Sequence, residues 1–393
     1  MHKQATRAFR KAGRTTATGA KSLPRKYFVS PEILNEEQEK IFSRNWLLIG
    51  HQSQIANAGD YFVQRVNGES LIVIRDKSGE IHGFFNVCRH RGSRLIEDDG
   101  GNCAAIQCPY HAWTYALDGR LIGAPHMDEV PGFDKANYPL HPVNPALWEG
   151  FIFINLNDGA ARLRSEATAR QRSGDFISLE RWFAPLKGKF SQWNMSILQP
   201  AKRIEYDVHA NWKLMFENYS ECYHCPGVHP QLQKVSPYDS AENDLPEGPF
   251  LGGFMKINRG KSLTMSGKAC ALEIADQEEE GEEAKHRVFY YSIFPNMLLS
   301  MHPEYVMVHQ LWPQSPEHTL ILCDWFFHPD AFARKDFHPQ DAIEFWDMTN
   351  KQDWHVCELS QQGITSRTYE PGPYSSRESI PAAWDRYYLR VMR

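Results

Sequence analysis

Alternating apolar and polar positions, broken at short intervals by turn residues, distinguish the chain between residues 46 and 160. Segments such as YFVQRV, LIVIRD and IHGFFNV are separated by turn signals such as DKSG, and the later segments WTYAL and RLIGA flank the pair Asp118-Gly119. A period of two residues with turns at this spacing predicts short antiparallel strands. We therefore expect a small all-β domain over residues 46–160.

Helical signals precede this β-rich stretch, and a mixed pattern follows it. Pro31 comes directly after Ser30 and is followed by several acids, which predicts a helix from Pro31 to Asn45. Residues 158–190 are polar and indicate a linker followed by a short helix. Beyond them the pattern predicts an early helix over Asn211–Tyr223 and a long last helix over Pro339–Gln361. It also predicts five strands, over Trp193–Tyr206, Arg287–Phe294, Asn296–Met301, Tyr305–Trp312 and His318–Phe327. The expected fold class is α+β, with an N-terminal arm and helix over residues 1–45 and a mixed domain over residues 161–393.

Composition narrows the class of protein. The chain has 393 residues, a formal charge of −5 and eight cysteines. Negative net charge argues against a nucleic-acid surface, and no apolar run approaches the roughly eighteen residues of a membrane span. The first thirty residues are basic and lack the apolar core of a secretory signal, so we expect a disordered basic arm and a cytoplasmic protein. In the reducing cytoplasm, cysteines are free thiols or metal ligands. The acidic stretch Gln277–Glu283 is expected to be a solvated loop.

Two cysteine–histidine pairs within the β-rich stretch form a first candidate metal site. Cys88-x-His90 is followed, after seventeen residues, by Cys108-x-x-His111. Two thiolates for one iron and two neutral imidazoles for the other are what a 2Fe–2S cluster of raised potential requires. Zinc is the rival metal, but zinc fingers usually pair Cys with Cys and His with His. The sequence therefore predicts a 2Fe–2S cluster, with Cys103 outside the pattern as an ordinary buried thiol.

A second candidate metal site lies on the predicted helix Asn211–Tyr223 and just after it. Glu217, Glu221 and His224 are spaced i, i+4 and i+7, so we expect them on one helical face. His229 follows the break at Pro226-Gly227, which lets the chain return a second imidazole to the same metal. Two histidines and one carboxylate on one side of an iron leave positions open for O2 and substrate.

The carboxylate ligand of this second site must come from elsewhere in the chain. The late helix offers Asp353 as the first choice, with Asp347 and Glu358 as alternatives. Glu221 has a further expected role, since it could accept a hydrogen bond from the far nitrogen of His224 and fix the tautomer of that ring.

Four segments resemble the α subunits of Rieske non-haem iron oxygenases, namely CRHRG, CPYHAWTYALDG, NWKLMFENYSECYH and QDWHVCELSQQG. The resemblance implies a small all-β Rieske domain inserted in a helix-grip catalytic domain, in which an antiparallel sheet wraps around a long helix. It assigns the cluster to Cys88, His90, Cys108 and His111, and the catalytic mononuclear Fe(II) to His224, His229 and Asp353. It also implies a homotrimer in which Glu221 bridges the two centres across a subunit boundary, and a separate flavin/iron–sulfur reductase that delivers electrons from NAD(P)H.

The residue at the bridging position, Glu221, also indicates which branch of the family the chain resembles. Many ring-hydroxylating members have Asp at the bridging position, whereas ECYHC resembles the branch that oxidises quaternary ammonium compounds such as glycine betaine, carnitine or stachydrine. We therefore expect hydroxylation of an N-methyl group of a small cationic substrate, with Tyr219 as a candidate wall of an aromatic cage or else an ordinary core tyrosine. The alternatives are an aromatic-ring hydroxylating or demethylating oxygenase, an electron carrier with a degenerate catalytic domain, and a zinc-stabilised binding module. Cys222 and Cys225, which flank His224, are expected only to pack.

Overall fold

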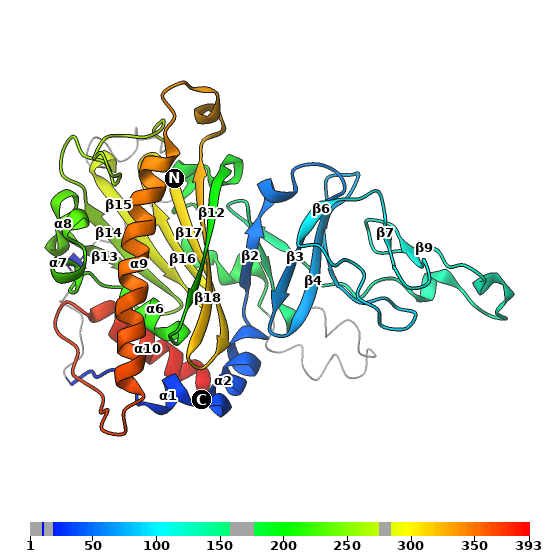
Figure 1. Ribbon diagram of the computed structural model, residues 1–393, viewed down its shortest axis with the longest axis horizontal. Helices are drawn as coiled ribbons and strands as arrows, with labels where there is room; N and C mark the ends of the chain where they lie inside the picture. The colour runs from blue at the N-terminus through cyan, green and yellow to red at the C-terminus, as the bar shows by residue number, and fades with distance from the viewer. Residues whose placement is uncertain (1–9, 12–18, 158–176, 275–283) are drawn as a thin grey trace, which may run out of the picture. The chain divides into compact units, whose positions relative to one another are not determined.

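The chain folds into two compact units in the computed structural model, which describes residues 10–11, 19–157, 177–274 and 284–393 (Figure 1). The large unit comprises the described residues within 1–41 and 189–393, and the small unit comprises those within 42–188. Most of the basic arm, part of the expected linker and the acidic stretch Gln277–Glu283 lie outside the described residues.

The small unit is built from antiparallel strands in three sheets. Their orders are β10-β11-β2, β5-β4-β3-β6 and β7-β8-β9. The strands are β2 (Leu47–His51), β3 (Asp60–Val66), β4 (Glu69–Arg75), β5 (Ile81–Phe85), β6 (Gly100–Asn102), β7 (Ile106–Gln107), β8 (Thr114–Tyr115), β9 (Leu121–Gly123), β10 (Ala146–Trp148) and β11 (Phe151–Ile154), and the described helix is α5 (Leu179–Trp182). The expectation of a small all-β domain is confirmed.

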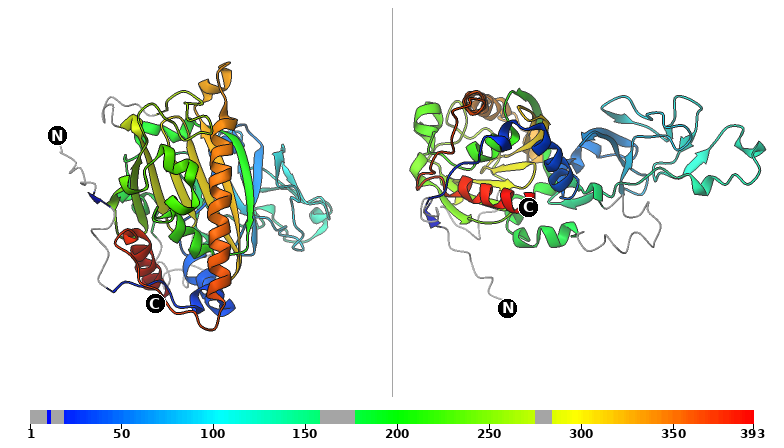
Figure 2. Two further views of the ribbon diagram at one scale, coloured as in Figure 1. Left: turned by 60° about the vertical axis from the view of Figure 1, so that its left-hand side comes forward. Right: turned by 90° about the horizontal axis from the view of Figure 1, so that it is seen from below.

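One antiparallel sheet of eight strands forms the frame of the large unit, in the order β1-β13-β14-β15-β16-β17-β18-β12. Its strands are β1 (Arg10–Lys11), β12 (Gln199–Val208), β13 (Glu242–Leu245), β14 (Phe250–Lys256), β15 (Arg287–Ile293), β16 (Met297–Met301), β17 (Val306–Ser315) and β18 (His318–Phe327). Figures 1 and 2 show the long helix α9 (Pro339–Ile364) crossing one face of this sheet with α6 (Trp212–Tyr219) beside it. The expected antiparallel sheet around a long helix is therefore confirmed.

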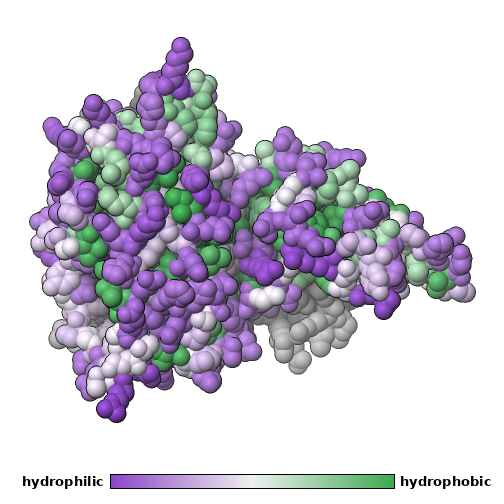
Figure 3. Space-filling view, in the orientation of Figure 1, coloured by the Kyte–Doolittle hydropathy of each residue, from purple (hydrophilic) through white to green (hydrophobic). Residues whose placement is uncertain are grey.

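Shorter helices complete the large unit. They are α1 (Lys26–Val29), α2 (Pro31–Glu37), α7 (Cys225–Val228), α8 (Pro230–Val235) and α10 (Ser379–Met392). Single 3-10 turns occur in both units, at Gln52–Ile55, Met127–Glu129, Lys135–Asn137, Ala184–Leu186, Ser191–Trp193, Met195–Ile197, Tyr238–Ser240, Ala284–His286 and Pro329–Ala333. Figure 3 shows hydrophilic residues over most of the visible face of the large unit, with scattered hydrophobic ones between them. No helix in the described ranges is both long and apolar enough to cross a bilayer.

Two predicted helices end earlier than the sequence suggests. Ser30 caps α2 by accepting a hydrogen bond from the Ile33 N–H, but the α-helix stops at Glu37 and continues only as a π-helical turn, Gln38–Phe42. The helix predicted from Asn211 to Tyr223 stops at Tyr219. The expectation that Glu217, Glu221 and His224 share one helical face is therefore wrong, because Glu221 and His224 lie on the loop that follows.

A buried ion pair fixes the start of α6. Lys213 Nζ lies 2.6 Å from Glu37 Oε1, and the two side chains are 0% and 1% exposed. The second carboxylate oxygen of Glu37 accepts a hydrogen bond from Trp212 Nε1 at 2.8 Å, and Tyr388 on α10 donates to Oε1 at 2.5 Å. These contacts join α2, α6 and α10 around two charges that have no access to water, so each charge depends on its partner.

We predict that replacing Lys213 with Met destabilises the fold by about 3–5 kcal/mol, because the Glu37 carboxylate then stays buried without a counter-charge. The matched control is Lys351→Met, which removes an i,i+4 pair with Asp347 whose lysine is 65% exposed and should cost at most about 0.5 kcal/mol. Chemical unfolding of both variants measures the difference. Equal losses would contradict the assigned role of the buried pair.

A second buried cluster holds two carboxyl groups that face each other. Glu217 on α6 contacts Asp385 on α10, and Tyr374 donates a hydrogen bond to Asp385 Oδ2 at 2.7 Å. Burial raises the pKa of Asp385 to about 7 and raises the pKa of Glu217 as well, with the neighbouring carboxyl adding to the effect on Glu217. The pair therefore retains a proton in the folded state that both acids lose in the unfolded chain.

This shared proton predicts a loss of stability as the pH rises. The folded pKa lies above the unfolded value of 3.8, so the contribution of Asp385 is complete below about pH 4 and disappears as the pH rises through about 7. The slope attributable to one proton is roughly 1.4 kcal/mol per pH unit. In Asp385→Asn an amide replaces the shared proton, so between pH 5 and pH 8 the variant should lose less stability than the native chain. Parallel pH profiles of the unfolding midpoint would refute this.

Candidate functional site

Two loops of the small unit carry the cysteine–histidine pairs, and they have nearly the same backbone. In the first loop the Cys88 N–H donates to Ser93 O at 2.8 Å, and in the second the Cys108 N–H donates to Trp113 O at 2.8 Å. Four residues after each cysteine the backbone takes a positive φ, 75° at Gly92 and 56° at Ala112. This left-handed residue turns each loop back on itself, so that each presents one thiol and one imidazole.

The side chains of these loops divide by type between interior and surface. Both cysteines are buried at 3% and 2% exposure, whereas His90 is exposed and His111 is half-buried. The centroids of the His90 and His111 rings lie 4.7 Å apart, and His90 stacks on Trp113 at 4.8 Å. Thiols on the inside and imidazoles on the outside match the two unlike irons of a Rieske cluster.

Hydrogen-bond donors surround the two sulfur atoms. Burial opposes ionisation of Cys108, but the backbone N–H groups of Tyr110 and His111 outweigh it and lower the pKa of this thiol. The hydroxyl of Tyr115 lies 3.4 Å from Cys88 Sγ and opposes the effect of burial, which nevertheless raises the pKa of the Cys88 thiol. Donors aimed at sulfur stabilise a thiolate, which is the form that binds iron, so these residues fit the cluster that the sequence predicts.

The second constellation forms on the loop after α6. The Glu221 carboxylate accepts hydrogen bonds from the backbone N–H groups of Tyr223 and His224, which closes a tight turn there. Helix α7 then begins at Cys225, and His229 lies between α7 and α8. The turn brings the rings of His224 and His229 close together, with their centroids 5.2 Å apart.

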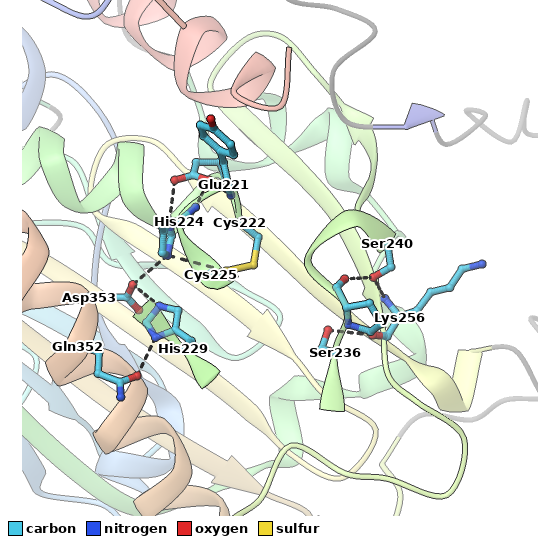
Figure 4. Close-up of a disulfide and its surroundings, with 12 residues drawn as sticks. Glu221, Cys222, His224, Cys225, His229, Ser236, Ser240, Lys256, Gln352 and Asp353 are labelled. Atoms are coloured by element: carbon cyan, nitrogen blue, oxygen red, sulfur yellow. Dashed lines mark hydrogen bonds and ion pairs between the residues drawn. A yellow bond between two sulfur atoms is a disulfide. The ribbon is translucent and has the colours of Figure 1, made fainter. Parts of the chain in front are cut away.

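Three donor atoms converge on one point (Figure 4). Asp353 Oδ1, on α9, lies 3.2 Å from His224 Nε2 and 2.8 Å from His229 Nε2. The opposite ring nitrogens are held by separate acceptors, His224 Nδ1 by Glu221 Oε1 at 2.6 Å and His229 Nδ1 by Gln352 Oε1 at 2.8 Å. When Nδ1 donates its proton to these acceptors, both Nε2 lone pairs face Asp353, which is the arrangement of a His2–carboxylate iron site.

A proton on His224 balances the negative charge of Asp353 and Glu221 at the place where a metal cation would bind. Burial disfavours the imidazolium of His224, but hydrogen bonds to Asp353 and Glu221 outweigh it and raise its pKa to about 10. Burial likewise opposes the Asp353 carboxylate, but the two histidines lower its pKa to about 2. A divalent metal ion that displaced this proton would satisfy the same carboxylate, so the donor set fits iron.

The other two candidate carboxylates lie outside this cluster. Asp347 accepts a hydrogen bond from Tyr206 at 3.0 Å and pairs with Lys351. Glu358 accepts from the backbone N–H of His209 at 3.0 Å. Of the three acids considered on α9, only Asp353 contacts His224 and His229.

Aromatic side chains wall a small cavity of about 60 Å³ over the histidines. Tyr219 lines it and donates to or accepts from Ser300 Oγ at 2.8 Å. Sequence reasoning missed the other rings of the wall, which are Tyr290, His309, Trp346 and Trp354. Burial lowers the pKa of His309 to about 4, so this ring is neutral. A larger cavity of about 390 Å³ adjoins the first and shares Tyr219, Glu221, Cys222, Met255 and Tyr290 with it.

Cys222 and Cys225 form a disulfide across the turn between Glu221 and α7. The expectations that these cysteines only pack, and that the cysteines of this chain are free thiols or metal ligands, are wrong for this pair. The other six cysteines are free, and Cys103 is partly buried against the core of the small unit. The sequence signal for this disulfide is the spacing C-x-x-C of the two residues.

Comparison with known proteins identifies both units. Residues 45–134 match the model of the Rieske [2Fe-2S] domain, and residues 195–393 match the model of the ring hydroxylating alpha subunit (catalytic domain). The oxygenase subunit of glycine betaine monooxygenase from Chromohalobacter salexigens is 32% identical, over 91% of this chain and 82% of that protein. The oxygenase subunit of carnitine monooxygenase from Escherichia coli is 29% identical, over 88% and 85%.

Solved structures agree on the fold. A crystal structure of the quaternary ammonium Rieske monooxygenase CntA superposes with a TM-score of 0.78 at 24% identity, covering 95% of this chain and 96% of the other. Naphthalene 1,2-dioxygenase from Rhodococcus sp. gives a TM-score of 0.72 at 20% identity, covering 94% of each chain. With both domain models matched and relatives aligned over nine-tenths of its length, the chain belongs to the oxygenase α subunits of the Rieske non-haem iron oxygenases.

Proposed function

We propose that this protein is the oxygenase component of a monooxygenase that hydroxylates an N-methyl group of a small quaternary ammonium compound, of the glycine betaine or carnitine type. The hydroxylated methyl group then leaves as formaldehyde. The observation that carries the proposal is the convergence of His224, His229 and Asp353 beneath an aromatic-walled cavity. The relatives that act on glycine betaine and carnitine support the same substrate class.

The aromatic wall of the cavity favours a cation. Among the described residues that line it, the charged groups are Glu221, Asp353 and His224, which hydrogen-bonds to both carboxylates, and none is a lysine or an arginine. Aromatic faces attract a quaternary ammonium group through their negative π surface, by about 0.5–2 kcal/mol per ring. Tyr219 is therefore proposed as a wall of the substrate cage.

In this reaction the residues of the chain orient the iron ligands, hold the substrate and keep water out of the cavity. When bound, the mononuclear iron supplies activation of O2, and the cluster supplies electrons to it. Glu221 and Gln352 hold the imidazoles of His224 and His229 with Nε2 toward the metal. The aromatic wall would exclude water and hold one N-methyl group of the substrate close to His224, His229 and Asp353, the residues that would hold the iron.

Assembly and electron supply follow from the family resemblance. We propose a cytoplasmic homotrimer that receives electrons from a separate NAD(P)H-dependent flavin/iron–sulfur reductase, with Cys88, His90, Cys108 and His111 as cluster ligands. The exposure of His90 supports this, since it leaves the imidazole side of the cluster within reach of a neighbouring subunit. Glu221 then bridges a cluster histidine of one subunit to His224 of the next.

The metal assignment predicts a selective loss in His224→Ala. Turnover should fall by more than roughly 100-fold, the upper limit for removal of an outer partner of a ligand. Iron content should fall from about three to about two per chain while the visible spectrum of the cluster stays unchanged. The control is His355→Ala, an exposed histidine of α9, which should retain both iron and activity. Loss of the cluster spectrum in His224→Ala would overturn the ligand assignment.

The substrate class predicts the products of a single turnover. Reduced enzyme mixed with O2 and glycine betaine or carnitine should release formaldehyde, and the same enzyme with aromatic acids should not. If only ring-hydroxylated product appears, the protein is an aromatic-ring oxygenase instead.

Substitution of the proposed cage wall refines this test. Tyr219→Leu removes the ring and should raise the KM for the cation by about 5- to 30-fold, which corresponds to about 1–2 kcal/mol. Tyr219→Phe keeps the ring and should stay near the native value. Equal effects of the two variants would leave Tyr219 as a core residue bonded to Ser300.

A further inference from the structure

The disulfide Cys222–Cys225 lies beside the proposed iron ligands and has no role in the reaction described above (Figure 4). It spans the turn between Glu221 and helix α7, with the iron-binding His224 inside the bridged segment. Cys225 is 3% exposed and lines the metal cavity, whereas Cys222 is half-buried and lines both that cavity and the larger one beside it. The two residues therefore differ in exposure, and Cys222 is the one that also lines the larger cavity.

Cys225 Sγ lies close to the ring nitrogens of the two histidines. It lies 3.9 Å from His224 Nε2, and donor atoms of His224, Cys225 and His229 all lie within 4.8 Å of one another. Ligand atoms bound to one metal at about 2.0–2.3 Å lie roughly 3–4.5 Å apart, so only a small movement would bring this sulfur to the metal. While it remains in the disulfide, the sulfur carries no charge and is a poor ligand.

We propose that Cys225 is an additional, thiol-controlled ligand of this metal site. Opening of the disulfide gives a thiolate that binds the metal together with His224 and His229 and thereby changes the metal preference of the site. The proposal rests on the iron site proposed above. A Cys–His–His set is softer than two histidines and a carboxylate and favours Zn²⁺ over Fe²⁺.

The opening step needs a dithiol as reductant. Its thiolate attacks the Sγ of Cys222, the half-buried residue that lines the larger cavity. A new S–S bond to Cys222 forms, and the Cys222–Cys225 bond breaks with its electron pair on Cys225. The second thiol of the reductant then displaces Cys222, which leaves as a thiol, and the reductant becomes a disulfide. Two electrons thus pass to the protein. Cys225 binds the metal as the thiolate and takes no proton.

Element-specific spectroscopy on the full chain tests this directly. The mononuclear site is loaded with Zn²⁺ while the iron cluster is kept intact, and zinc K-edge X-ray absorption then reports only the neighbours of zinc. The untreated protein should show nitrogen and oxygen at about 2.0–2.2 Å and no sulfur. After treatment with dithiothreitol, about one sulfur per zinc should appear at about 2.3 Å.

Three variants separate the sulfur atoms. Cys222→Ser leaves Cys225 as a free thiol, so the zinc–sulfur distance should appear without dithiothreitol. Cys225→Ser should never show it, and Cys103→Ser, a free cysteine of the small unit, should behave as the native chain does. In parallel, alkylation and mass spectrometry of the untreated protein should find Cys222 and Cys225 protected.

The outcomes distinguish this inference from the proposed function. Absence of sulfur after reduction, persistence of sulfur in Cys225→Ser, or free alkylation of both cysteines before reduction would each overturn the thiol ligand. Absence of histidine nitrogen around zinc in every sample would instead overturn the site formed by His224 and His229.

Discussion

The buried charge pair of Lys213 and Glu37 determines where the loop with the proposed iron ligands begins. Neither charge can reach water, so the first turn of α6 must stay against α2, and Tyr388 on α10 must keep its hydroxyl on the same carboxylate. Helix α6 is only eight residues long, and its far end leads directly into the Glu221 turn. The placement of His224 is therefore set by an interaction at the opposite end of this helix.

At both proposed metal sites the ligand atoms are surrounded by hydrogen-bond partners, but these partners differ between the two sites. In the small unit, backbone N–H groups and the Tyr115 hydroxyl are directed at the sulfur atoms, and positive φ residues shape both loops. In the large unit, side-chain acceptors on Glu221 and Gln352 set the orientation of the imidazoles. In both cases the atoms around the ligands prepare them for the metal.

Sequence reasoning was most successful where local pattern determines structure. The strand predicted over His318–Phe327 is found with those bounds, and Asp353, the acid predicted as iron ligand ahead of Asp347 and Glu358, contacts both histidines. It failed where a side chain competes with the helix. Periodicity extends the helix through Glu221, but the carboxylate of that residue caps the following turn instead.

Other features depend on contacts between distant segments and carry no local signal. Helix α10, strands β13 and β14, and the hydrogen bond from His229 to Gln352 belong to this group. The aromatic wall is similar, because its rings come from four separate segments that only the folded sheet and helices bring together.

The near identity of the two cluster loops has a consequence for which amino acids the second loop can accept. Ala112 takes the backbone conformation that glycine takes at the equivalent place in the first loop, Gly92. A β-carbon in this region is already crowded, and branching at that carbon makes the crowding worse. Variation at position 112 is thus limited by the shape of the main chain, although the side chain there is exposed.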